Sequence, residues 1–213
     1  MISTSSLFAY SAGSVVVAPE LGIGFTYPQA SLVGKDNADD DANQNMGLYW
    51  SLGFTGSYFF TENLALISGL TLEHNSSELE WKDANGAGDK FTVEFDQYRL
   101  VLPIGARFHY SMFMVGGGLH LSTIVSNKAT FNWPGAGDDE TGHLHAKAAL
   151  GFFIDAGVDI KTADKNSLLV FLRFKDDLTY FFRDRDFADS EGLFGGLRNL
   201  SLSLNASYSF QMN

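Results

Sequence analysis

The sequence has 213 residues, 14 Lys and Arg against 25 Asp and Glu for a formal net charge of -11, and no cysteine. This length favours one domain of moderate size, and the lack of cysteine excludes disulfides, thiolate metal sites and cysteine nucleophiles. The acidic balance argues against nucleic acid as a partner, because contact with phosphates needs a basic surface. The sequence has no apolar run of about 18 residues, so it predicts no membrane-spanning helix. The start, MISTSSLFAYSAGS, lacks the features of a secretory signal, which leaves a processed chain or a cytosolic protein.

Apolar and small polar residues alternate with a period of two in eight segments, which is typical of β-strands. In residues 15–27 the apolar set includes Leu21, Ile23 and Phe25, and the opposite set is mainly Gly, Ala and Thr with one Glu. The same alternation covers seven later segments: residues 48–60, 64–73, 98–108, 113–122, 144–160, 168–175 and 200–210.

The bulk of the apolar faces decides which face of these strands is inside. About forty large apolar side chains would not fit in an eight-stranded barrel, whose interior is just wide enough for side chains to fill. The opposite faces, rich in Gly, Ala, Ser and Thr, suit a narrow polar interior. We therefore expect the apolar faces to contact lipid, where a closed barrel satisfies all backbone polar groups.

The inward faces are predicted to carry ten charged residues, five of each sign. Charges are retained in such an interior when they pair, because an unpaired buried ion costs several kcal/mol. We expect this interior charge network to plug the lumen. Its members are Glu20, Glu73, Arg99, Arg107, Lys147, Asp155, Asp159, Arg173, Lys175 and Asp177.

The connections alternate between short and long. Residues 61–63, 109–111 and 161–166 are expected to be short turns, and residues 28–46, 75–90, 126–142 and 182–196 four long external loops. Short periplasmic turns, long external loops and an even strand number are typical of bacterial outer-membrane barrels. We expect residues 15–213 to form the barrel, residues 1–14 an N-terminal periplasmic segment, and both termini to lie in the periplasm.

The last strand carries the most specific pattern. Phe210 is the final aromatic residue, and Tyr208, Ala206, Leu204 and Leu202 precede it at successive alternate positions. This pattern is similar to the assembly signal of outer-membrane barrels, although QMN follows where that family usually ends on the aromatic.

Over residues 15–210 the sequence resembles the small OmpA/OmpX-like outer-membrane β-barrel families. The resemblance implies an all-β fold, an eight-stranded antiparallel up-and-down transmembrane barrel in the bacterial outer membrane. Outer-membrane lipid and lipopolysaccharide would surround such a barrel.

Several histidines invite catalytic or metal-binding interpretations. The residues HYS, 109–111, resemble the His-x-Ser pairing of outer-membrane lipid A deacylases, but they fall in a predicted periplasmic turn, whereas lipid A lies in the outer leaflet. We favour a turn with an interfacial tyrosine. His120, His143 and His145 are possible zinc ligands, and a lumen histidine paired with a carboxylate is the favoured alternative. No catalytic or metal residue and no cofactor is assigned.

The long loops are acidic and contain large aromatic residues. The segment KDNADDDANQN fails the EF-hand pattern, because Gln44 stands where Gly is needed and Trp50 where Glu is needed. Loose binding of divalent cations, contact with a basic partner, or plain solvation remain open. The loop aromatics either pack within the loops or recognise a partner, as aromatics do at interface hot spots. They are Trp81, Phe131, Trp133, Phe187 and Phe194.

Three functions fit these observations. The first is a non-enzymatic barrel with a closed polar interior, which acts as a structural or binding module through its loops, in surface recognition or as a subunit of an outer-membrane complex. The second is a lipid A or peptide hydrolase, which needs a nucleophile, a base and an orienting carboxylate at the outer rim. The third is a narrow pore. We favour the first, because the sequence shows no such catalytic cluster and ten charges would plug the lumen.

Overall fold

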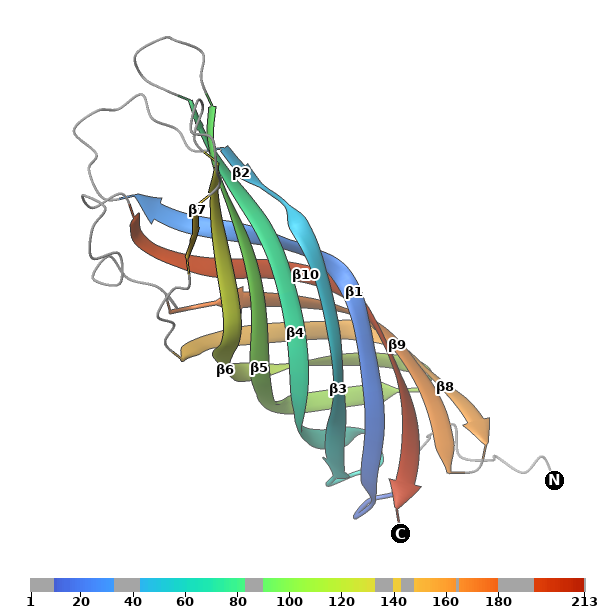
Figure 1. Ribbon diagram of the computed structural model, residues 1–213. Helices are drawn as coiled ribbons and strands as arrows, with labels where there is room; N and C mark the ends of the chain where they lie inside the picture. Colours follow the sequence, from blue (N-terminus) through green and yellow to red (C-terminus); the bar gives the residue numbers. More distant parts are fainter. Residues whose placement is uncertain are drawn as a thin grey trace, which may run out of the picture.

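The computed structural model describes residues 10–32, 43–82, 90–132, 140–142, 148–163, 165–179 and 194–212. All regular structure in these ranges is β-strand (Figure 1), and they contain no helix long and apolar enough to cross a membrane. The long strands are β1 (Val15–Leu32), β3 (Gly47–Phe59), β4 (Leu64–Lys82), β5 (Lys90–Tyr110), β6 (Phe113–Asn132), β8 (Ala149–Ala163), β9 (Asn166–Asp177) and β10 (Phe194–Met212). Two short strands, β2 (Asn43–Asn45) and β7 (Glu140–Gly142), accompany them.

The long strands form a closed antiparallel ring. Each pairs with the next long strand along the chain, and β1 pairs with β10 to close the ring (Figure 1). The ring order is therefore β1-β3-β4-β5-β6-β8-β9-β10, while β2 pairs with β4 and β7 pairs with β6 outside this order. The predicted eight-stranded up-and-down barrel is confirmed.

The side chains alternate as the sequence pattern predicts. Leu21, Ile23 and Phe25 of β1 are each 60% exposed, whereas Glu20 on the opposite face is 1% exposed. On β10, Leu204 is 52% exposed and its neighbours lie buried inside the ring. The exterior is therefore an apolar band, and its extent on β10, residues 200–210, matches the 9–11 residues or so that a tilted strand needs to cross a bilayer.

Several strands extend further than the sequence analysis predicted. The loop expected at residues 75–90 is largely strand, because β4 continues to Lys82 and β5 begins at Lys90; β6 likewise continues to Asn132. The loop prediction for residues 75–90 was wrong for a physical reason. Beyond the apolar band the outward face becomes polar, so the contrast between the two faces reverses while the hydrogen-bonded ladder continues. In this extension Leu79 and Val93 are fully buried on the inward face.

The predicted turn at residues 109–111 is also shorter than expected. His109 and Tyr110 belong to β5, and β6 begins at Phe113. Ser111 has a φ of 56°, a left-handed conformation that turn residues adopt.

Because the outer surface of β10 is apolar, a charged residue placed there should strongly destabilise the folded barrel in a bilayer. We expect Leu204→Arg to lower the free energy of unfolding in lipid bilayers by about 2–4 kcal/mol, because the charge would lie near the middle of the hydrocarbon. Met46→Arg is the matched control, since Met46 is 70% exposed between β2 and β3, beyond the band. Urea titration in vesicles measures both. Equal effects of the two substitutions would contradict a lipid-facing β10.

Candidate functional site

The inside of the barrel holds a first cluster of four charged residues. Arg173 of β9 donates to Glu20 of β1 (Nη1 to Oε1, 2.6 Å) and to Asp155 of β8 (Nε to Oδ1, 2.8 Å). Arg107 of β5 donates to Asp155 (Nη2 to Oδ2, 2.8 Å). Thr55 of β3 donates its hydroxyl hydrogen to Glu20 at 2.9 Å. Every charge in this cluster is therefore buried with an opposite charge beside it, the condition under which buried ions are tolerated.

The second cluster is a single ion pair further along the lumen. The ammonium group of Lys175 on β9 contacts the carboxylate of Glu73 on β4, and the ring of Tyr49 lies 4.9 Å from the Lys175 nitrogen. In the ring order, β4 and β9 are four strands apart in either direction. The Glu73–Lys175 pair therefore spans the whole width of the barrel.

A third cluster surrounds Asp177 at the end of β9. Arg99 of β5 holds this carboxylate through two hydrogen bonds of 2.9 and 2.8 Å, and His120 of β6 lies 2.9 Å from it. The backbone N–H of Asn199 donates to the same carboxylate at 3.2 Å, and Arg99 also donates to Ser122. Asp177 is thus fully surrounded by donors.

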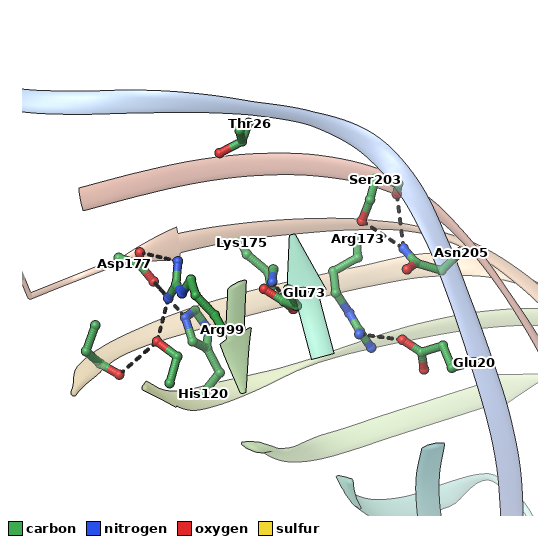
Figure 2. Close-up of polar contacts among 12 residues, drawn as sticks. Glu20, Thr26, Glu73, Arg99, His120, Arg173, Lys175, Asp177, Ser203 and Asn205 are labelled. Atoms are coloured by element: carbon green, nitrogen blue, oxygen red, sulfur yellow. Dashed lines mark hydrogen bonds and ion pairs between the residues drawn. The ribbon is translucent and has the colours of Figure 1, made fainter. Parts of the chain in front are cut away.

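Figure 2 shows residues of all three clusters in succession along the inside of the barrel, from Asp177 through Glu73 to Glu20. Most of the ion pairs join strands that are not neighbours in the sheet, such as β1 with β9 and β5 with β9. Side chains of such strands meet only by crossing the lumen. An eight-stranded barrel has a narrow interior, and three successive clusters of charged side chains lie across it.

Nine of the ten residues of the predicted interior network lie inside the ring, and the tenth falls outside the described residues. Lys147 lies in that undescribed part, and the other nine predicted charges are buried, none more than 7% exposed. Asp159 faces His109 (Oδ2 to Nδ1, 3.0 Å). Tyr49 and Thr55 are neighbours of the charges that the sequence pattern did not indicate. Their positions on the inward face were readable from the alternation, but their partners across the lumen were not.

Each histidine in the described residues is directed at an aspartate. His74 pairs with Asp96 at 2.7 Å, and His109 and His120 pair with carboxylates as given above. The carboxylate-paired interpretation of His120 therefore agrees with its geometry. His143 and His145 lie outside the described residues, and the described ranges hold no group of three or more acidic or histidine side chains suited to a metal ion.

The outer surface changes from apolar to polar along β4 and β5. Trp50, His74 and Tyr98 form an aromatic row, with His74 stacked on Trp50 at a ring distance of 5.4 Å. In the rows beyond, Ser76 pairs with Asp96, and Glu78 lies directly opposite Glu94. The aromatic row matches the interfacial girdle of barrels that span membranes.

A hollow of about 330 Å³ lies on this polar surface, and we call it the rim groove. Its charged lining consists of Glu78, Glu94, Asp96 and Lys128, and Met46 and Gly47 also contribute. Three carboxylates against one ammonium group give the rim groove a negative charge.

The structure describes the backbone of only three of the five predicted loop aromatics. Trp81, Phe131 and Phe194 lie in β4, β6 and β10, and only their backbones are described; Trp133 and Phe187 lie outside the described residues. The residues of the predicted assembly signal, Leu202, Leu204, Tyr208 and Phe210, lie on the outward face of β10.

No protein-family model matches the chain, and none of the curated proteins does either. Solved structures share its fold. OprG from Pseudomonas aeruginosa superposes with a TM-score of 0.51 at 12% identity over 96% of this chain and 98% of OprG. The Escherichia coli outer-membrane protease OmpT gives 0.51 at 7% identity, over 93% and 97% of the two chains. Ail of Yersinia pestis, solved in complex with the heparin analogue sucrose octasulfate, gives 0.42 at 11% identity, over 92% and 99%.

The closed ring, the apolar exterior and the ion-paired interior define the class of this protein. It has the fold of the bacterial outer-membrane β-barrels. Eight long strands form its ring, as the alternation of the sequence predicted.

The Glu73–Lys175 pair predicts a non-additive mutant cycle. Glu73→Gln leaves a buried ammonium group without its counter-ion and is expected to cost about 3–5 kcal/mol of unfolding free energy. Lys175→Met should cost a similar amount, and the double variant should recover most of the loss, because no unpaired charge remains. Denaturant unfolding of all four proteins measures the coupling. Additive losses would show that the two side chains do not interact.

Proposed function

We propose that the protein is an integral protein of the bacterial outer membrane with a closed lumen, and that it works as a non-enzymatic binding module at its outer rim. In this arrangement the short turns and both termini lie in the periplasm, and the long connections lie outside the cell. Lipid and lipopolysaccharide surround the apolar band, and the occupant of the rim is another macromolecule, from the environment or from the same membrane.

The ion pairs across the lumen are the observation that carries this proposal. They argue against a pore, since ions would have to displace side chains that neutralise one another in a low-dielectric interior. A barrel closed in this way presents only its two ends and its wall to other molecules. The strands β4, β5 and β6, with 19, 21 and 20 residues, extend the wall well beyond the apolar band, and that extension supplies a binding surface.

The charge of the rim groove favours a basic partner. Glu78 and Glu94 are cross-strand partners, and like charges placed directly opposite destabilise a sheet. Asn45 donates to Glu78 at 2.8 Å, but an amide only partly compensates a carboxylate. Lysine or arginine side chains of a partner would relieve the repulsion. Loose binding of divalent cations by the acidic loops stays a separate prediction.

The described residues give the hydrolase alternative no specific support. His109 is directed at Asp159 and packs edge-on against the ring of Tyr10, and its neighbour Ser111 occupies a turn. At the rim, His74 pairs with Asp96, while the Ser76 hydroxyl accepts a hydrogen bond from the backbone N–H of Leu48. Neither arrangement aligns a base with a nucleophile.

The binding proposal predicts that the rim carboxylates attract cationic chains. We expect Glu78→Gln/Glu94→Gln to weaken binding of a fluorescent dodecalysine peptide roughly ten-fold at low salt, because two charges are lost from one surface. The measurement uses protein in zwitterionic vesicles, so that the lipid does not bind the probe. Glu62→Gln, an exposed carboxylate in the turn between β3 and β4, should have little effect. An unchanged affinity of the double variant would overturn the proposal of a basic partner.

A closed lumen predicts that the protein conducts no ions across planar bilayers. The wild-type protein should give no stable conductance steps, and Arg107→Ala/Arg173→Ala should also stay silent, because the Glu73–Lys175 pair and the Asp177 cluster still cross the lumen. Steady conductance of the wild type would show that the ion pairs do not close the barrel.

A further inference from the structure

A short segment before β1, residues 10–14, folds back onto the barrel end where the short turns lie, and we call it the strap. The backbone N–H of Gly13 donates to the carbonyl of Phe59 at 2.7 Å, and the N–H of Phe59 donates to the carbonyl of Ser14 at 3.0 Å. The side-chain amide of Gln211 donates to the Ser11 hydroxyl at 3.3 Å. The strap is thus attached to β3 on one side of β1 and to β10 on the other.

The tight bend of the strap depends on Gly13. Its φ of 82° lies in the left-handed region, which glycine adopts without the steric cost that a β-carbon brings. The bend turns the chain so that Tyr10 lies inside the ring, with only 7% of its surface exposed.

Tyr10 makes contacts around most of the ring. Its ring stacks on Phe59 of β3 (centroids 4.2 Å, planes 26° apart) and meets His109 of β5 edge-on at 5.6 Å. Its hydroxyl lies 2.5 Å from the hydroxyl of Ser167 on β9. Val16 of β1 and Ala65 of β4 belong to the same buried apolar cluster.

The chemistry of the Tyr10 hydroxyl agrees with this enclosed position. Burial first, and then the nearby carboxylate of Asp159, raise the pKa of Tyr10 to about 12. Below that pH the phenol stays neutral and protonated, and its hydroxyl shares a hydrogen bond with the hydroxyl of Ser167. A neutral, rigid ring is well suited to exclude water from a narrow opening.

We propose that the strap is a stopper for the short-turn end of the lumen, in which Tyr10 fills the opening and the backbone of residues 11–14 holds the seam between the first and last strands. It separates the His109–Asp159 pair and the small inward side chains of β10 from water at that end. This inference goes beyond the proposed function, because it holds whether or not the rim binds a basic partner.

The absence of cysteine from the sequence makes a direct test possible. A single Ser207→Cys substitution places a thiol on the inward face of β10, where Ser207 is 3% exposed. With the protein folded in detergent micelles, its rate of modification by a charged methanethiosulfonate reagent reports access of water to the lumen. We expect Tyr10→Ala to raise this rate at least ten-fold, and Tyr10→Phe, which keeps the ring, to leave it within two-fold.

A second cysteine separates a stopper from general loosening of the barrel. Ser201→Cys lies near the Asp177 cluster toward the other end and is also buried, at 4% exposure. Its modification rate should not respond to Tyr10→Ala. An equal increase at both positions would overturn the proposal, because it would mean that the whole barrel had opened, and an unchanged rate at position 207 would overturn it as well.

Gly13→Val keeps Tyr10 but strains the bend that positions it. If the strap acts as proposed, this variant should raise the rate at position 207 as Tyr10→Ala does. Heat-modifiable migration in SDS gels verifies the folded barrel for each variant. Should Tyr10→Ala not fold, the comparison of Gly13→Val with the unaltered strap decides the question, and an equal rate for those two proteins would overturn the proposal.

Discussion

The structure depends on one constraint, that backbone N–H and C=O groups in hydrocarbon must all be hydrogen-bonded within the protein. For strands this requires a closed ring, and here the pairing of β1 with β10 closes it. The first and last parts of the chain are therefore neighbours by necessity. Closure also divides every strand into a lipid face and a lumen face, and this division accounts for the alternation of Leu204 with Ser203 and Asn205.

A ring of eight strands leaves little room inside, and the narrow lumen explains the interior chemistry. Small residues occupy most inward positions, while the few long charged side chains reach partners on distant strands. Glu73 and Lys175 lie 102 residues apart in the chain yet meet across the whole width of the barrel. In such an interior each charge needs its partner, because water cannot solvate it. The network thus joins opposite sides of the wall through the lumen.

The two ends of the barrel differ because the outer surface must be apolar only inside the hydrocarbon. Beyond the aromatic row the outer surface can be polar. On the long-connection side, β4, β5 and β6 continue as a sheet with an acidic outer surface and a small apolar core around Leu79 and Val93. On the short-turn side the strap folds inward, and Tyr10 fills the opening. We therefore infer that one end is built to contact other molecules and the other end to stay closed.

The sequence by itself determined the strand faces, the closed antiparallel barrel and the identity of the buried charges, because a period of two is a local property that any window such as residues 200–210 displays. The pairing of those charges, the extension of β4 to Lys82 and the inward position of Tyr10 were decided only by the tertiary structure. These features depend on which distant strands face one another once the ring has closed: Tyr10 meets Ser167 across 157 residues of chain. No local pattern encodes such a contact, since it follows from the order, tilt and width of the ring.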